Sequence, residues 1–321
     1  MLAINPKTLH LEQYPCPNLG SEELLISVKA IGVNHADLLQ RRGNYPPPLG
    51  SSPILGLEVC GVVKQIDPHV KRFKKDDLVM CLLQGGGYAE KVVVHESRCM
   101  LLPKNLSFVY GAAIPEVFLT AYQALFTIGQ LQPGQWVLIH TGGSGVGTAA
   151  IQLSRAIDAK PLVTTRSQEK LEKCLAIGAS AAINPTTSGF AKKVLELTEG
   201  QGSDLILDFV GASYFKENME AIAPGGAMIC LATLGGAQVE NFDLRQLLKK
   251  WVTFSGTTLR SRPQDYVAKL IEEFSDFALP RFETGSLRPI IDTVFPWGKA
   301  KEAHKKLLQN QAFGKIVLIV E

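Results

Sequence analysis

Residues 136–155 read Trp-Val-Leu-Ile-His-Thr-Gly-Gly-Ser-Gly-Val-Gly-Thr-Ala-Ala-Ile-Gln-Leu-Ser-Arg, and this stretch decides the fold. A short apolar run comes first, then a glycine-rich turn, then apolar residues at helical spacing. The pattern predicts a strand, a tight turn and the start of a helix. Within the turn, the spacing Gly142-x-Ser144-x-x-Gly147 matches a dinucleotide-binding fingerprint whose middle glycine is a serine.

Such a turn brings the unpaired N–H groups of a helix N-terminus against a pyrophosphate, and the helix dipole also favours negative charge there. The Ser144 hydroxyl is expected to donate to a phosphate oxygen. A turn that merely connects a strand to a helix is the alternative interpretation. The residues expected to contact the dinucleotide are Gly142, Ser144, Gly145, Val146 and Gly147.

Length and composition indicate a two-domain globular protein. The chain has 321 residues, of which 46% are hydrophobic, and a formal net charge of +3. The basic residues are scattered, so no nucleic-acid partner is expected. No apolar run reaches the roughly 18 residues of a membrane span, and no signal peptide is evident, so no membrane partner is expected either. The six cysteines form no Cys-x-x-Cys pair, which predicts reduced thiols in a cytoplasmic protein.

Two compositional regimes follow one another along the chain. Up to about residue 115, short strands separated by Gly and Pro are expected at 24–28, 54–63, 78–83 and 90–94. From about residue 117 to 260, six strands are expected at 137–140, 162–165, 181–183, 205–208, 227–231 and 252–255. Helices are expected between them, at 146–157, 168–177, 188–198, 213–222 and 242–249.

This alternation predicts an α/β fold with a doubly wound parallel sheet. The tail returns to mixed structure, and we expect it to fold back onto the first regime. Its expected elements are a helix at 263–278, a strand at 290–294, a helix at 298–308 and a strand at 315–320.

Several stretches besides the glycine turn resemble the zinc-free quinone oxidoreductases, the zeta-crystallin family, of the medium-chain dehydrogenase/reductase superfamily. They are 34–37 with 41–46, 113–115, 119–122, 134–155, 257–262 and 314–318. The resemblance implies a GroES-like, mainly-β catalytic domain formed by residues 1–117 and 263–321. It also implies a Rossmann NADPH-binding domain at 118–262 with a six-stranded sheet, NADPH in the cleft between the domains, and a homodimer.

The zinc ligands of related alcohol dehydrogenases are missing. Those enzymes have a cysteine where this chain has Asn34 and a histidine where it has Leu57, and their structural-zinc lobe is absent after residue 94. Leucine cannot bind a metal, and isolated carboxylates do not make a tetrahedral site. His35 and His95 are conceivable ligands, but isolated histidines of this kind are expected to be ordinary solvated or hydrogen-bonded residues. No metal is expected, which favours reduction of an electron-poor acceptor over alcohol oxidation.

The end of the second expected strand predicts the cofactor. An NAD enzyme usually has an acidic residue there for the ribose hydroxyls, but residues 162–167 contain none. Arg166 and Lys170 are suited to a 2′-phosphate, and Ser167 to a hydrogen bond with it, next to Thr165. The alternative is that Ser167 only caps a helix and Lys170 is solvated. The sequence therefore predicts NADPH. The tyrosine that relatives stack on the adenine is replaced by Asn184-Pro185.

The resemblance also implies residues around the nicotinamide. Asn34, Tyr45 and Thr120 are expected to flank it as catalytic residues. Tyr45 is expected to stack on a quinone or to donate to the developing oxyanion, or else only to close a proline-rich turn. The other expected cofactor contacts are Leu234, Thr257, Thr258, Leu259 and Phe313.

Three functions are consistent with these features. The first is NADPH-dependent reduction of quinones. The second is reduction of the C=C bond of an α,β-unsaturated carbonyl or acyl thioester, which requires protonation of an enolate. The third is non-enzymatic binding of NADPH or RNA.

Overall fold

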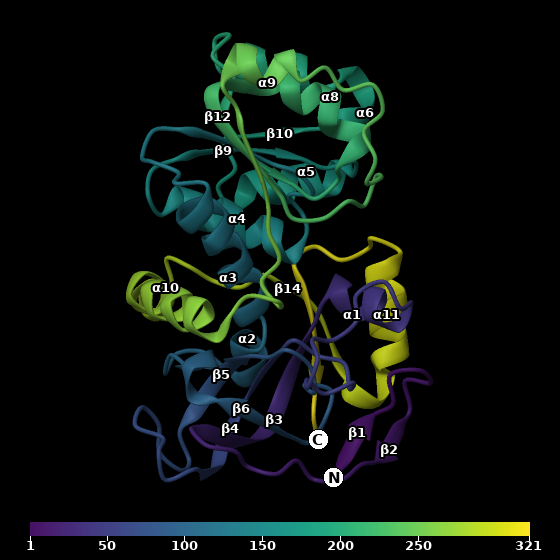
Figure 1. Ribbon diagram of the computed structural model, residues 1–321, viewed down its shortest axis with the longest axis vertical. Coiled ribbons are helices and arrows are strands. Elements are labelled where there is room, and N and C mark those ends of the chain that lie inside the picture. The colour runs from purple at the N-terminus through teal and green to yellow at the C-terminus, as the bar shows by residue number, and fades with distance from the viewer. The chain divides into compact units, whose positions relative to one another are not determined.

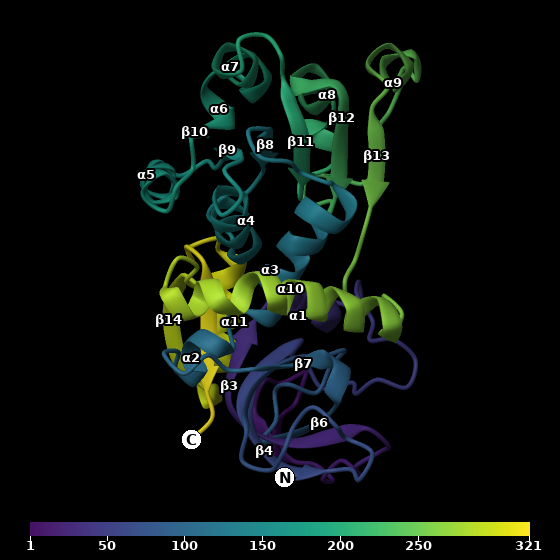
Figure 2. The same cartoon turned by 90° about the vertical axis from the view of Figure 1, so that its left-hand side faces the viewer.

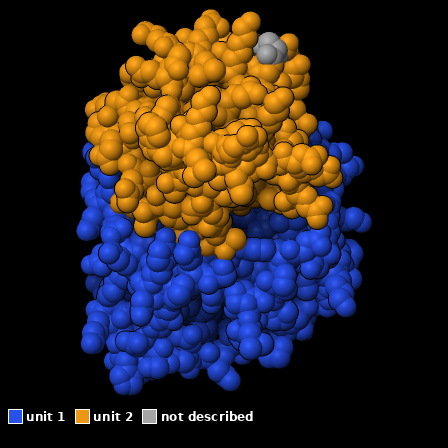
Figure 3. All heavy atoms as spheres, turned by 45° about the horizontal axis from the view of Figure 1, so that its top comes forward, with its two compact units in different colours: residues 1–119, 259–321 blue, residues 120–258 orange. Residues whose placement is uncertain are grey.

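The computed structural model describes the backbone of residues 1–321 and every side chain except that of Ser188. The chain divides into two compact units (Figure 3). Unit 1 consists of residues 1–119 and 259–321, and unit 2 of residues 120–258. Both chain ends therefore belong to unit 1, whereas unit 2 is one continuous segment.

Unit 2 contains a parallel six-stranded sheet with the strand order β10-β9-β8-β11-β12-β13, which Figure 2 shows from left to right. All five strand pairs are parallel. The order reverses next to β8, as in doubly wound nucleotide-binding sheets, and the predicted sheet is confirmed. The strands are β8 (Trp136–Ile139), β9 (Lys160–Thr164), β10 (Ala181–Ile183), β11 (Ser203–Asp208), β12 (Ile222–Cys230) and β13 (Thr253–Gly256).

The helices of unit 2 follow the expected alternation with one difference. A short helix that was not expected, Pro185–Ser188, precedes the helix expected at 188–198, which begins at Phe190; Gly189, with a φ of +69°, separates the two. Asn184 caps the first of them, since its Oδ1 accepts from Thr186 N at 3.0 Å. The helices are α4 (Gly145–Arg155), α5 (Gln168–Ala176), α6 (Pro185–Ser188), α7 (Phe190–Leu197), α8 (Ala212–Ala221) and α9 (Arg245–Lys250), with the π-helix η2 (Gln123–Ile128) before β8.

Unit 1 contains a seven-stranded sheet with the order β14-β15-β3-β4-β5-β7, and β6 also pairs with β3. β15 runs antiparallel to β3 with Ile316 opposite Val33, so the yellow C-terminal strand lies beside purple β3 in Figure 1. This pairing confirms that the tail folds back onto the first regime. The strands are β3 (Glu23–Val33), β4 (Glu58–Ile66), β5 (Leu78–Leu82), β6 (Lys91–His95), β7 (Cys99–Leu101), β14 (Ile291–Pro296) and β15 (Lys315–Ile319).

The long helix of unit 1, α10 (Gln264–Thr284), continues past its expected end at residue 278 although Pro280 lies inside it. Phe282 is fully buried, and its ring centre lies 5.1 Å from that of Phe118, so apolar burial offsets the hydrogen bond that proline removes. The helix ends at Gly285, with a φ of +77°. The remaining elements are β1 (Leu2–Ile4), β2 (Leu11–Gln13), α1 (His35–Arg41), η1 (Glu96–Arg98), α2 (Phe108–Gly111), η3 (Trp297–Lys299) and α11 (Ala300–Leu308), while α3 (Pro115–Tyr122) crosses the boundary between the units.

Candidate nucleotide and acceptor sites

The glycine turn in unit 2 presents a free helix N-terminus. Ser144 is the N-cap of α4, and its Oγ accepts from Gly147 N at 3.0 Å. None of the hydrogen bonds among the described residues uses the N–H groups of Gly145 or Val146. These two donors, at the positive end of an 11-residue helix, are suited to an anionic ligand.

Glycine is required at two positions of the turn, because neighbouring backbone and strand atoms leave no room for a Cβ there. A Cβ on Gly147 would lie 2.6 Å from Thr141 O and 2.7 Å from Gly142 O. A Cβ on Gly142 would lie 2.7 Å from the Cβ of Val163 in β9. The turn is therefore packed against its own entry and against the neighbouring strand, which fixes the direction of the N–H groups.

A buried polar network that the sequence did not reveal lies beneath the turn. His140 Nδ1 lies 2.8 Å from Thr164 Oγ1, and His140 Nε2 lies 2.7 Å from Asn218 Oδ1. Asn218 Nδ2 donates to Asp208 Oδ2 at 3.2 Å, and Asp208 Oδ1 accepts from Gly211 N at 3.0 Å. The network ties the carboxyl ends of β8, β9 and β11 together, where ligands bind in such sheets. Burial lowers the pKa of His140, so its ring is neutral.

The residues expected at the 2′-phosphate lie at the carboxyl end of β9 and the start of α5. Ser167 is the N-cap of α5, and its Oγ accepts from Lys170 N at 3.4 Å. Arg166 is exposed, and Thr165 N donates to Ile183 O at 3.1 Å. Gly142 N donates to Thr164 O at 3.0 Å, which joins this segment to the glycine turn.

In unit 1, Asn34 belongs to a buried charged cluster. Its Nδ2 donates to Glu58 Oε1 at 2.9 Å, and its Oδ1 accepts from Lys315 Nζ at 2.7 Å. Lys315 Nζ also donates to Glu58 Oε1 at 2.6 Å and to Val33 O at 2.9 Å, which uses all three donors. Glu58 is fully buried and Lys315 is 3% exposed. Their mutual pairing and the Asn34 amide offset the cost of burying two charges.

A second set of buried groups adjoins this cluster. Asp37 accepts from Asn34 N at 2.8 Å and from Gly56 N at 3.1 Å, and burial raises its pKa to about 6. The Tyr88 hydroxyl lies 3.2 Å from Asp37 Oδ2 and 2.9 Å from His304 Nε2. Burial lowers the pKa of His304 to about 4. Asn34 and Asp37 have the spacing of a capping box, and this local pattern could have predicted the contact between them.

Tyr45 is held by Arg260. The guanidinium lies 5.3 Å from the centre of the Tyr45 ring and donates to Tyr45 O at 3.3 Å. Arg260 also donates to Gln84 O at 2.8 Å and to Gln40 Oε1 at 2.9 Å. Burial raises the pKa of the Tyr45 phenol, which therefore stays protonated at neutral pH. Arg260 was part of a family stretch, but its contact with Tyr45 was not foreseen.

The remaining predicted site residues are divided between the units. In unit 1, Leu259 is buried, and Phe313 N donates to Asp292 Oδ1 at 2.9 Å. In unit 2, Thr257 Oγ1 donates to Gln123 Oε1 at 3.3 Å and Leu234 is 56% exposed. Thr258 lies just after β13, and Thr120 is half-buried in α3.

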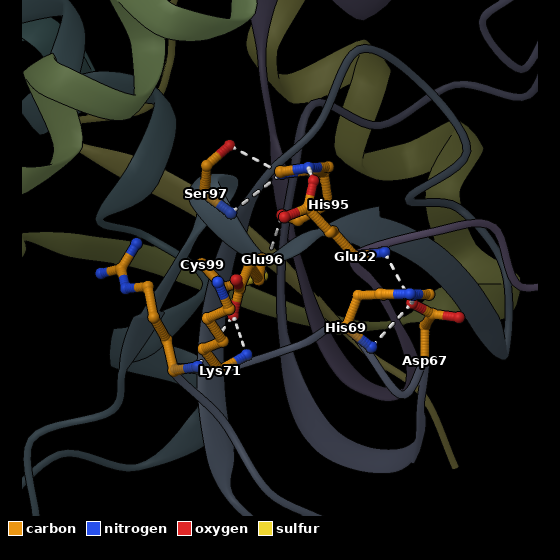
Figure 4. A network of polar contacts seen from close by, with 9 residues as sticks. Glu22, Asp67, His69, Lys71, His95, Glu96, Ser97 and Cys99 are labelled. Carbon is orange, nitrogen blue, oxygen red and sulfur yellow. Dashed lines mark hydrogen bonds and ion pairs between the residues drawn. The ribbon is translucent and has the colours of Figure 1, made fainter.

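A separate polar network holds the loops at one end of the unit 1 sheet (Figure 4). His95 Nδ1 lies 2.9 Å from Ser97 Oγ and His95 Nε2 lies 3.4 Å from Glu22 Oε2. Glu96 Oε2 accepts from Lys71 N at 3.0 Å, and from Arg72 N as well. These contacts secure the charged loop after β4 and give His95 a structural role.

Comparison with known proteins gives matches for both units. Residues 20–104 match the alcohol dehydrogenase GroES-like domain, and residues 145–276 match the zinc-binding dehydrogenase family. The chain is 32% identical to the quinone oxidoreductase of Sus scrofa over 93% of this chain and 89% of that protein. The Escherichia coli quinone oxidoreductase complexed with NADPH has a TM-score of 0.87 at 25% identity, covering 99% of each chain. The CurF ER cyclopropanase of curacin A biosynthesis has a TM-score of 0.85 at 27% identity, covering 100% of this chain and 98% of that one.

A two-unit chain with a GroES-like domain and a doubly wound nucleotide-binding sheet defines a class of pyridine-nucleotide oxidoreductases. The chain belongs to this class as a member of the medium-chain dehydrogenase/reductase superfamily, and its relatives include quinone oxidoreductases.

The donor set does not fit the zinc ion that the name of one matching family implies. Within the described part of the chain, no group of three or more His, Cys, Asp or Glu side chains is placed to hold a metal ion. Where a metal would need ligands, Asn34 and Glu58 bind the ammonium of Lys315 instead. None of the described helices has the length and apolar character that crossing a bilayer requires.

Proposed function

We propose that the protein reduces quinones with NADPH and without a metal ion. The observation that carries the proposal is the free N-terminus of α4, where Gly145 and Val146 N–H groups are unused beside a turn with the dinucleotide-binding spacing. The similarity to quinone oxidoreductases, one of them an NADPH complex, supports it. A cytoplasmic location, inferred from the isolated cysteines, belongs to the same proposal.

The residues of the chain would divide the work as follows. The α4 N-terminus binds the pyrophosphate, and Arg166, Ser167 and Lys170 bind the 2′-phosphate. Bound NADPH supplies a hydride. Tyr45, protonated and fixed by Arg260, donates a hydrogen bond to the oxygen on which negative charge develops.

The oxidation of NADPH by different acceptors tests this function. Purified protein is mixed with NADPH and with 1,2-naphthoquinone, phenanthrenequinone, an enal or an enone, and the loss of NADPH absorbance is followed. Turnover with the quinones alone is expected. Tight NADPH binding without turnover on any acceptor, together with salt-sensitive RNA affinity, would instead favour a binding protein.

Reduction of an activated C=C bond is the second candidate. The similarity to the CurF ER cyclopropanase and the protonated Tyr45 phenol favour it. This reaction needs a proton on the α-carbon, so faster reduction of the enal and a strong dependence on the Tyr45 hydroxyl would select it over quinone reduction.

The assignment of the 2′-phosphate predicts the effect of Lys170→Glu. Replacing a cation by an anion at this position should weaken NADPH binding about tenfold or more, because a charge-assisted contact becomes a repulsive one. NADH lacks the phosphate, so its affinity should change little. Dissociation constants for both nucleotides, measured by quenching of protein fluorescence, check this. Equal losses for the two would refute the assignment.

A further inference from the structure

His140 is a fully buried polar residue in unit 2 that none of the proposed steps uses. It follows β8 directly and comes two residues before Gly142, the first glycine of the nucleotide-binding turn. The ring of Phe190 in α7 packs against the imidazole in a T-shaped arrangement with 4.8 Å between ring centres, and the ring of Tyr214 in α8 does so at 5.0 Å. Contacts from two helices therefore restrict the orientation of the imidazole.

The hydrogen bonds around His140 run in one direction. Asp208 accepts at both carboxylate oxygens, from backbone N–H groups of the loop after β11 and from Asn218 Nδ2. The oxygen of the Asn218 amide therefore faces His140 Nε2, which must carry the hydrogen. The other ring nitrogen, Nδ1, then has no hydrogen and accepts from Thr164 Oγ1 at 2.8 Å. The network thus fixes the imidazole in the tautomer with its hydrogen on Nε2.

Thr164 connects His140 to the nucleotide site. The paired part of β8 and β9 ends at Ile139 opposite Val163, and Thr164 is the next residue of β9. Beyond that pair, two bonds of Thr164 continue the connection between the two strand ends. Its hydroxyl donates to His140, and its carbonyl oxygen accepts from Gly142 N at 3.0 Å. The chain then continues into residues 165–167, which are expected at the 2′-phosphate and lead into α5.

The geometry points to His140 as a positioning residue that sets the preference for NADPH over NADH, an inference that rests on the proposed 2′-phosphate site. The pyrophosphate and the 2′-phosphate are both attached to the adenosine ribose, so the protein groups that bind them must keep a fixed separation. The His140–Thr164 bond fixes the separation between the glycine turn and residues 165–167. NADH lacks the 2′-phosphate and uses the turn alone, so this bond should add affinity for NADPH and little for NADH.

Thr164→Val tests this inference, because it removes the hydroxyl and keeps a β-branched side chain in the strand. The dissociation constant for NADPH should rise about tenfold and that for NADH by less than about twofold, so the ratio of the two should fall. Thr164→Ser returns a hydroxyl and should recover most of the ratio. Calorimetric titration with both nucleotides measures these constants and requires no turnover.

Thr198→Val is the matched control. Thr198 is also a buried threonine of unit 2, and its hydroxyl donates to Val194 O at 2.9 Å and accepts from Gly202 N at 2.9 Å. It lies before β11 begins at Ser203, at the edge of the sheet opposite the carboxyl ends of the strands. This variant should lose stability and keep the wild-type ratio of dissociation constants, which separates positioning from a general loss of stability.

A Thr164→Val protein that folds and keeps the wild-type ratio, or that loses affinity equally for both nucleotides, would overturn the inference. Nitrogen-15 NMR of the wild type provides a second readout that needs no altered protein to fold. The spectrum at pH 7 should contain a neutral histidine with its hydrogen on Nε2 that bonds to the Thr164 hydroxyl, whereas hydrogen on Nδ1 of His140 would overturn the inference.

The outcome can be distinguished from that of the proposed function. A protein that binds NADPH with the expected ratios but reduces no quinone would contradict quinone reduction and support the role of His140. Equal losses for the two nucleotides in Lys170→Glu would remove the 2′-phosphate site, and this inference with it.

Discussion

At the scale of single residues, the pair formed by Lys315 and Glu58 organises the buried polar cluster around Asn34 in unit 1. The two residues are 257 positions apart in the sequence, and no local pattern links them. The resemblance predicted a role for Asn34, but not that both ends of its amide bind this pair. Polar residues of a site can be predicted from the sequence more readily than the residues they bind, because the tertiary fold determines which side chains come into contact.

Lys315→Met should be strongly destabilising. It leaves the Glu58 carboxylate buried without its cation, which costs about 3–5 kcal/mol in comparable pairs. Urea unfolding of the variant and of the wild type measures the difference in free energy. Lys301→Met, on the exposed face of α11, is the control and should change little. A loss of less than about 1 kcal/mol would show that Glu58 is neutralised in another way.

At the scale of elements, the sequence predicts well wherever the signal is local. The strand, glycine turn and helix of residues 136–155 appear as β8 and α4, because apolar periodicity and turn chemistry lie within one short stretch. The prediction was wrong at two helix ends. The helix expected from residue 188 begins only at Phe190, after Gly189, and the burial of Phe282 carries α10 past Pro280. Both outcomes depend on backbone geometry or packing that periodicity does not record.

Gly147→Ala should damage the nucleotide site through the turn itself. The added methyl would lie 2.6 Å from Thr141 O, so the turn must shift and redirect the N–H groups of Gly145 and Val146. We expect the dissociation constant for NADPH to rise about tenfold or more. Gly298→Ala, where nothing lies within 4 Å of the new methyl, is the control. Calorimetric titration of both variants checks this, and unchanged affinity for Gly147→Ala would show that these N–H groups are not the binding donors.

At the scale of the whole molecule, β13 is one of the two edge strands of the unit 2 sheet. Phe254 in this strand is 50% exposed, and Trp251 just before it is 68% exposed. An unprotected edge with apolar side chains is suited to pairing with another chain. The homodimer that the resemblance implies is therefore expected to form through β13.

Phe254→Lys should disrupt this dimer, because a charge on an edge strand opposes pairing. Light scattering should give the wild type about twice the chain mass of 34.9 kDa, and the variant a mass nearer to one chain. Leu308→Lys, an exposed position in α11, is the control and should remain dimeric. A wild-type protein that is monomeric at all concentrations would contradict the expectation.

The position of β15 between β14 and β3 has a consequence for biosynthesis. The strands β3, β4 and β5 leave the ribosome early, but β3 cannot complete its pairing until β15 has been made. Unit 2, a continuous segment, is free to fold in the meantime. Through most of translation, the nascent chain thus has an unpaired strand edge at β3 and a Glu58 carboxylate without its lysine partner. Chaperones therefore have the most time to bind at the N-terminal strands.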